Sequence, residues 1–126
     1  MLESILLRQG ASTGTYTSPH VVDFNERICI DGMPASDNEI VAAFERVESA
    51  RDTVPLTYFE YGTLAALAVF AEHDVDYVIL EVGMGGKLDA VNAVEPDASL
   101  ITNVSLDHCD WLGNDIETIA REKAGI

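Results

Sequence analysis

Three polar residues that could bind a metal ion stand at the ends of predicted strands. Ser18 and His108 each follow a short strand, and Glu81 lies in the last positions of another. Open α/β sheets bind ligands at the carboxyl ends of their strands. Hydroxyl and carboxylate oxygens suit Mg²⁺, and imidazole is a common metal ligand. Together the three residues indicate one metal- or phosphate-binding site.

Taken singly, Glu81 and His108 each also have a structural interpretation. Glu81 lies in an apolar run, where a buried carboxylate is costly unless it is paired, metal-bound or hydrogen-bonded to N–H groups of the following glycine turn. His108 stands between Asp107 and Asp110, which could orient its ring as carboxylates orient ligating histidines. A hydrogen-bonded loop histidine would have the same sequence.

Other chemistries are less well supported. Cys109 beside His108 suggests a nucleophile, but neighbouring side chains point in different directions and no oxyanion hole is indicated. Ser18 lacks a G-x-S-x-G context, and the glycine-rich turn at 83–86 matches neither G-x-G-x-x-G nor G-x-x-x-x-G-K-[ST]. Lys123 near a helix end could simply complement the helix dipole, but the chain has only one other lysine.

The elements that must position these residues alternate between helices and strands. The pairs Ser36/Glu39 and Thr57/Glu60 are capping boxes, and the run 64–70 is apolar all round, which predicts burial on several sides. Asn114 is expected to cap the last helix. Helices are predicted at 1–9, 36–50, 57–72 and 114–123, and strands at 13–17, 27–30, 76–82 and 98–104. Because 76–82 and 98–104 are continuous apolar runs, both are predicted to be interior parallel strands of a three-layer, mostly parallel α/β fold.

Composition excludes several functions. The 126 residues include 22 acidic and 7 basic ones, for a net charge of −15, which excludes binding to nucleic acid or to an anionic membrane surface. No apolar run could span a bilayer, whereas 48% hydrophobic residues argue for one folded domain. Two distant cysteines suggest reduced thiols and a cytoplasmic protein. Five arginines but two lysines suggest adaptation to high salt, which predicts loss of structure at low ionic strength.

Several ordered motifs resemble one family. They are Y-T-S-P-H at 16–20, N-E-R-I at 25–28, L-T-Y-F-E-Y-G-T-L at 56–64, L-E-V-G-M-G-G-K-L-D-A at 80–90, L-D-H at 106–108 with W-L-G at 111–113, and E-K-A-G-I at 122–126. These motifs span nearly the whole chain and resemble folylpolyglutamate synthase/dihydrofolate synthase of the Mur ligase superfamily. The resemblance implies a P-loop-type central domain, here incomplete.

The resemblance also implies an activity and its site residues. A carboxylate of dihydropteroate or of a folate is phosphorylated by ATP, and L-glutamate attacks the acyl phosphate. The residues that match metal ligands for two Mg²⁺ ions are Ser18, Glu81, His108 and a carbamylated Lys123, and of these Glu81, His108 and Lys123 would be catalytic. Substrate-binding residues would be Thr57, Tyr58, Phe59, Leu88, Asp89 and Ala90.

Some family features are absent. The glycine-rich phosphate loop that family members carry just before the helix matching 1–9, and their C-terminal domain, are not among these 126 residues, which alone are therefore expected to be inactive. The complete protein is expected to be monomeric. Lys87, Val91 and Cys109 replace the Arg, Thr and Thr that are common in the family. Alternatives are another Mur-type ligase, for muramyl peptides or cyanophycin, and a non-catalytic remnant or interaction module. A phosphate-binding α/β domain of other chemistry is the generic alternative.

Overall fold

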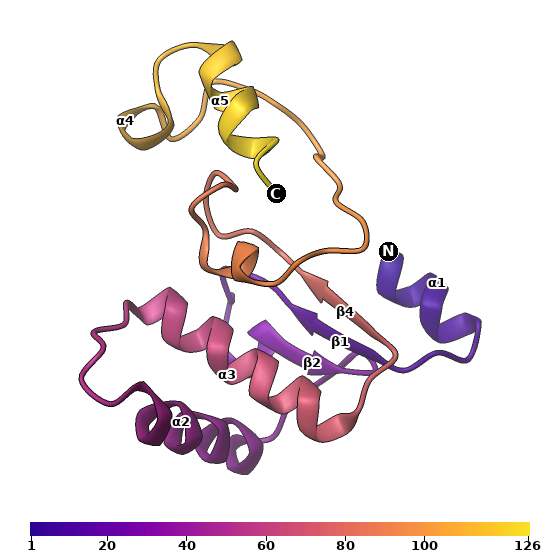
Figure 1. Ribbon diagram of the computed structural model, residues 1–126. Coiled ribbons are helices and arrows are strands. Elements are labelled where there is room, and N and C mark those ends of the chain that lie inside the picture. The colour runs from indigo at the N-terminus through magenta and orange to yellow at the C-terminus, as the bar shows by residue number, and fades with distance from the viewer. The chain divides into compact units, whose positions relative to one another are not determined.

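The computed structural model describes the backbone of residues 1–126 and all side chains except those of residues 109 and 110. The chain forms two compact units, residues 1–81 and 82–126 (Figure 1). The first contains α1 (Leu2–Arg8), β1 (Thr13–Tyr16), the 3₁₀ turn η1 (Phe24–Arg27), β2 (Ile28–Ile30), β3 (Met33–Pro34), α2 (Asp37–Arg51), α3 (Tyr58–His73) and β4 (Tyr77–Leu80). The second contains η2 (Ala90–Ala93), α4 (Cys109–Leu112) and α5 (Ile116–Lys123).

The first unit confirms the α/β class, but its sheet is mixed rather than mostly parallel. The strand order is β3-β2-β1-β4, and only β1 and β4 run parallel. Asp31 and Gly32 have φ values of 51° and 77°, as in the tight turn of a hairpin, which forces β2 and β3 to be antiparallel. The short strand β3 was not predicted. A parallel pair needs a long crossover connection, and α2 and α3 supply it between β3 and β4. This connection allows β4 to pair in parallel with β1.

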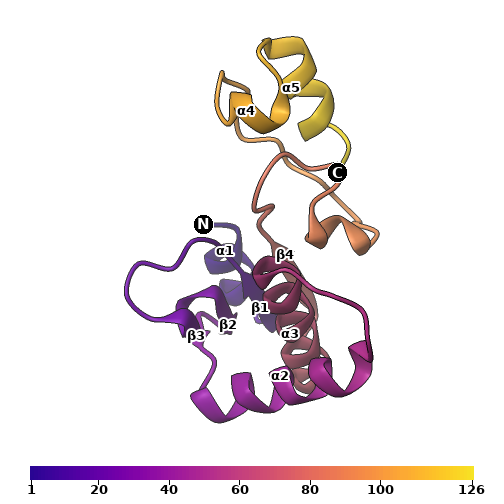
Figure 2. The same cartoon turned by 90° about the vertical axis from the view of Figure 1, so that its left-hand side faces the viewer.

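Helices cover both faces of this sheet, as the three-layer prediction requires. A Cβ on Gly14 would lie 2.5 Å from Cδ1 of Phe70 in α3. The hydroxyl of the next residue, Thr15, donates to Glu3 of α1 at 2.7 Å. Successive strand residues point to opposite faces, so α1 and α3 lie on opposite sides of β1 (Figure 2).

The apolar run 64–70 supplies much of the core. Ala65, Ala66 and Val69 are fully buried and Phe70 nearly so, which confirms the predicted burial, although Leu64 is 42% exposed. The helix carrying this run is in turn covered by α2, which buries Ile40, Ala43 and Val47.

Two strand predictions are wrong. The strand β4 is parallel as predicted, but it lies at an edge of the sheet, with Tyr77 52% and Val78 44% exposed. Residues 98–104 form no strand in the described part of the chain, and Leu100 is 79% exposed. An apolar run becomes a strand only where a neighbour accepts its backbone hydrogen bonds, and sequence alone does not show that neighbour.

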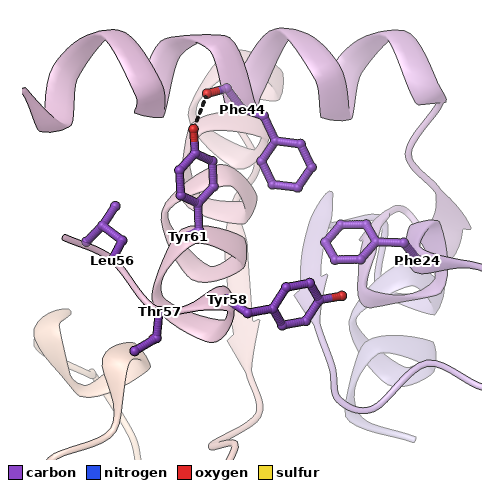
Figure 3. A pocket seen from close by; sticks show the side chains of 6 residues that line it. All are labelled: Phe24, Phe44, Leu56, Thr57, Tyr58 and Tyr61. Carbon is purple, nitrogen blue, oxygen red and sulfur yellow. Dashed lines mark hydrogen bonds between the residues drawn. The ribbon is translucent and has the colours of Figure 1, made fainter.

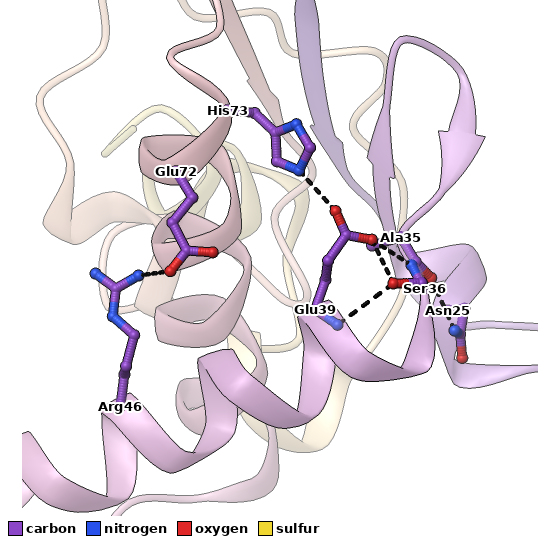
Figure 4. Close-up of polar contacts among 7 residues, drawn as sticks. All are labelled: Asn25, Ala35, Ser36, Glu39, Arg46, Glu72 and His73. Carbon is purple, nitrogen blue, oxygen red and sulfur yellow. Dashed lines mark hydrogen bonds and ion pairs between the residues drawn. The ribbon is translucent and has the colours of Figure 1, made fainter.

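Both predicted capping boxes are present, and one of them reaches a second helix. Glu39 accepts from the backbone N–H and hydroxyl of Ser36 at 2.8 and 2.6 Å. Its other oxygen lies 2.7 Å from Nε2 of His73 at the end of α3 (Figure 4). Further along the two helices Arg46 pairs with Glu72. Glu39 therefore caps α2 and links it to α3.

The Glu39 contacts predict a pH-dependent contribution to stability. Hydrogen bonds from Ser36 and then His73 lower the pKa of Glu39 from 4.5 to about 2. Because the folded-state pKa is depressed, this stabilisation is present above pH 4.5 and is lost as the pH falls toward 2. We expect Glu39→Gln to cost about 1 kcal/mol at pH 7 and to flatten the decline of Tm between these pH values. Thermal unfolding across pH measures both, with Glu45→Gln, an exposed carboxylate on the same helix, as the control. Equal pH profiles for the two variants would contradict this role.

The second unit begins its last helix one residue later than predicted. Asp115, not Asn114, is the N-cap of α5, and its carboxylate accepts from the N–H and hydroxyl of Thr118 at 2.9 and 2.7 Å. The helix therefore begins after Asp115, whose side chain accepts from a free N–H of its first turn. Among the residues described, no helix is both long enough and apolar enough to cross a membrane.

Candidate functional site

Ser18 and Glu81 meet at the carboxyl ends of two parallel strands. Tyr16 and Leu80 are paired in the ladder between β1 and β4, and the N–H of Glu81 donates to the carbonyl of Tyr16 at 2.9 Å. The backbone N–H of Ser18 then donates to Oε2 of Glu81 at 2.9 Å. The predicted convergence of Ser18 and Glu81 is confirmed.

The environment of Glu81 differs from the prediction. Its side chain is exposed rather than buried, because it lies beyond the last paired residue of an edge strand. It does accept a backbone N–H, but from Ser18 and not from the glycine turn. Among the described residues, neither Oγ of Ser18 nor Oε1 of Glu81 makes a hydrogen bond. The Ser18 N–H bond brings the two residues together, and both a hydroxyl and a carboxylate oxygen are ligands that a hard cation such as Mg²⁺ accepts.

His108 and its neighbouring acid lie in the second unit. His108 is exposed and has a φ of 50°. Its Nε2 lies 3.8 Å from Oδ2 of Asp107. The backbone N–H of His108 donates to Oδ1 of the same carboxylate at 2.8 Å. At 3.8 Å the ring nitrogen makes no hydrogen bond to Asp107, so the orienting role of this acid stays a prediction. The side chains of Cys109 and Asp110, the suggested nucleophile and the second acid, lie outside the described residues.

The glycine-rich turn packs tightly against the end of α5, where Lys123 is the last helical residue. A Cβ on Gly86 would lie 2.8 Å from the carbonyl oxygen of Glu122 and 3.1 Å from that of Lys123. The N–H of Lys87 donates to the carbonyl of Glu122 at 3.0 Å. This contact places the predicted substrate-binding segment 88–90 directly after residues that touch the end of α5.

Asn92 completes this contact and was not among the predicted site residues. Its amide donates to the carbonyls of Lys87 and Gly125 at 3.1 and 2.9 Å, so one side chain ties the turn to the chain beyond α5. An asparagine after a glycine-rich turn carries no pattern that would single it out. Gly86 and Gly125 allow the close approach. In the sequence they stood out only as members of the family motifs.

The predicted substrate residues 88–90 differ in what their side chains do. Leu88 is 90% exposed and is free to contact a ligand. The carboxylate of Asp89 accepts from the N–H groups of Met84 and Val91, both at 3.0 Å, and caps η2. Asp89 therefore shapes its own loop, a structural role that the sequence analysis did not anticipate.

The predicted substrate residues 57–59 lie at the start of α3, and Thr57 and Tyr58 line a pocket. Thr57 is the N-cap of α3, Tyr58 is 64% exposed, and the ring of Phe59 packs on Tyr16 with centroids 5.7 Å apart. The pocket has a volume of about 430 Å³ (Figure 3). It is lined by Phe24, Phe44, Leu56, Thr57, Tyr58 and Tyr61, of which the sequence analysis had named only Thr57 and Tyr58.

One wall of the pocket is held by Tyr61. Its hydroxyl donates toward the carbonyl of Phe44 and the carboxylate of Glu48, at 3.1 and 2.9 Å. Partial desolvation and the Glu48 carboxylate raise the pKa of Tyr61. The pocket is therefore aromatic and uncharged at its wall, which suits a flat, apolar ring.

Comparison with known proteins identifies close relatives. The model of the family described as Mur ligase middle domain matches residues 36–126. The chain is 52% identical over 125 residues to the dihydrofolate synthase/folylpolyglutamate synthase of Escherichia coli, covering 99% of this chain and 30% of the relative. The chain thus spans about 30% of the length of that curated relative.

Solved structures give the same result. The E. coli FolC structure in complex with DHPP and ADP matches with a TM-score of 0.98 and 52% identity, over 99% of this chain and 30% of that chain. A bifunctional folylpolyglutamate synthase/dihydrofolate synthase from Yersinia pestis, complexed with AMPPNP and Mn ion, matches with a TM-score of 0.94 and 51% identity, over 98% and 30%.

Proposed function

This chain belongs to the Mur ligase middle-domain family, and on that basis we propose that it acts in an ATP-dependent ligase that joins L-glutamate to dihydropteroate or to a folate. The observation that carries the proposal is the 52% identity to the E. coli enzyme across nearly the whole chain. The free oxygens of Ser18 and Glu81 at the strand ends support it, because phosphoryl transfer needs a cation there.

The proposed reaction has two steps. A substrate carboxylate oxygen attacks the γ-phosphorus of ATP, and ADP leaves. The amine of L-glutamate then attacks the carbonyl carbon of the acyl phosphate, losing a proton, and phosphate leaves. Bound Mg²⁺ would neutralise charge on the transferred group. The residues proposed to hold two such ions are Ser18, Glu81, His108 and Lys123 as a carbamate.

Substrate binding is proposed for the segments 57–59 and 88–90. The exposed ring of Tyr58 and the exposed Leu88 offer apolar surface for a pteridine or aminobenzoyl ring. Asp89 would contribute through the loop shape that its two N–H contacts fix. Ala90 is the first residue of η2, directly after Asp89.

Two alternative functions make different predictions about ligands. Another Mur-type ligase, for muramyl peptides or cyanophycin, would bind metal but no pteroate, whereas a non-catalytic remnant or interaction module would bind neither. The exposed tyrosine beside the aromatic pocket favours the folate assignment. We also propose that the complete protein is monomeric, that it is cytoplasmic and that it is adapted to high salt.

Metal and pteroate binding test the proposal on the 126-residue chain. The EPR signal of free Mn²⁺ measures how tightly the chain binds this ion. We expect the affinity to fall at least about tenfold in Glu81→Gln, because a neutral amide replaces a negatively charged ligand. Glu45→Gln, which changes an exposed glutamate on α2, should leave it unchanged. Fluorescence titration should detect binding of dihydropteroate. Equal metal affinity in the two variants, or absence of pteroate binding, would overturn the folate-ligase proposal.

A further inference from the structure

Arg27 is a buried cation that has no acidic partner among the side chains that the structure describes. It is only 8% exposed, although the chain carries 22 acidic residues. Among the residues whose side chains are described, no carboxylate lies within ion-pair distance of its guanidinium. Burying an unpaired charge is costly, so the surroundings of Arg27 must stabilise it in another way.

Aromatic rings and one histidine stabilise this guanidinium. Its central carbon lies 5.8 Å from the ring centroid of Phe24 and 5.5 Å from that of Tyr58, distances typical of cation–π contacts. Nε donates to Nδ1 of His20 at 2.8 Å. The rings of Phe24 and Tyr58 meet edge to face at 6.1 Å, and His20 meets Phe24 at 6.0 Å. We call His20, Phe24, Arg27 and Tyr58 the Arg27 cluster.

The Arg27 cluster joins two segments that are far apart in the sequence. Tyr58 is the first residue of α3, whereas the other three members lie in or just before η1. The carbonyl of Arg27 accepts from the N–H of Thr17 at 2.9 Å, which fixes the residue immediately before Ser18.

The loop between Ser18 and η1 is fixed from the same side. The carboxylate of Glu26 accepts from the N–H groups of Val21, Val22 and Asp23 at 2.8 to 3.0 Å, and these bonds lower the pKa of Glu26. These three hydrogen bonds hold the loop to Glu26, the residue directly before Arg27.

We propose that Arg27 is a positioning residue: its guanidinium holds the loop that carries Ser18 against the first turn of α3. This proposal rests on the function proposed above, in which Ser18 binds metal and residues 57–59 bind the pteroate. Arg27 touches neither ligand. It keeps the two candidate subsites in one geometry, because moving the Tyr58 ring moves the guanidinium and with it the backbone before Ser18.

The chemistry of the cluster requires arginine. The planar guanidinium can face two rings and still donate through Nε, whereas a lysine ammonium is a compact and strongly hydrated charge. Lysine could therefore lie near the rings but could not reproduce both contacts. The His20 nitrogen that accepts from Arg27 must be unprotonated, which places the ring proton on Nε2.

Amide hydrogen exchange in the 126-residue chain, without metal or substrate, tests the coupling directly. We expect the Ser18 amide to exchange at least about tenfold faster in Arg27→Met and to an intermediate degree in Arg27→Lys. Glu81→Gln weakens the hydrogen-bond acceptor of the Ser18 amide, so its exchange rate shows how fast this amide exchanges when that bond is weakened. Arg8→Met, at an exposed arginine of α1, should change nothing. Unchanged protection of the Val47 amide in α2 would show that the variants remain folded.

A second variant covers the case in which Arg27→Met does not fold. Tyr58→Leu removes a cluster ring from an exposed position, and should also speed Ser18 exchange, whereas Tyr58→Phe should keep the wild-type rate. Wild-type protection of Ser18 in both Arg27→Met and Tyr58→Leu would overturn the coupling. If these variants release Ser18 but the wild-type chain binds no dihydropteroate, the coupling stands and the proposed function fails.

Discussion

Gly14→Ala is expected to destabilise the first unit by about 3 kcal/mol, a large share of the stability of a small domain. The new Cβ would lie 2.5 Å from Cδ1 and 2.7 Å from Cγ of Phe70, closer than non-bonded carbon atoms can approach. Phe70 is 2% exposed and packed within the core, so its ring has no free space into which to move. Either β1 or α3 must therefore shift. A shift of β1 is opposed by its backbone hydrogen bonds to β2 and β4.

Urea unfolding followed by tyrosine fluorescence measures this effect. Because the clash is with a side chain, Phe70→Leu in the Gly14→Ala background should recover part of the loss, with a coupling energy of about 1 to 2 kcal/mol. Phe70→Leu alone should be destabilising, since it leaves a cavity. Purely additive effects in the double variant would show that Gly14 and Phe70 do not contact each other as described.

The features predicted correctly depend on residues close together in the sequence. The capping boxes at Ser36 and Thr57 form because an N-cap and its third neighbour meet wherever a helix begins. The meeting of Ser18 with Glu81 needed one further assumption, that their strands are parallel neighbours. The correct predictions came from sequence patterns that allow only one local geometry.

The failed predictions concern long-range partners. Residues 98–104 have the composition of a buried strand but pair with no strand in the described part of the chain. Glu81 seemed buried because its neighbours are apolar, yet it follows an edge strand. The Arg27 cluster also depends on a long-range contact, since Tyr58 approaches from α3. The metal-binding roles of His108 and Lys123 stay predictions, as do those of Ser18 and Glu81.

Gly86→Ala is expected to separate the glycine-rich turn from α5 and to destabilise the second unit. Its Cβ would lie 2.8 Å from the carbonyl oxygen of Glu122 and 2.7 Å from Cγ2 of Ile126. Separating the turn from α5 would break the Lys87 N–H bond to Glu122 and leave Asn92 unable to reach the carbonyls of both Lys87 and Gly125. Overpacking together with these lost hydrogen bonds predicts a cost of about 3 to 4 kcal/mol.

The exchange rate of the Lys87 amide, which should rise at least about a hundredfold, reports this separation locally. Ile126→Ala provides the decisive control: it removes one of the clashing groups but leaves the backbone oxygen of Glu122 in place, so it should not rescue Gly86→Ala. Rescue would mean that the turn contacts only a side chain. Under the proposed function, Gly86→Ala should also abolish dihydropteroate binding, because the substrate segment 88–90 would lose its support at the end of α5. Retained binding with a fast-exchanging Lys87 amide would show that this contact does not position the substrate segment.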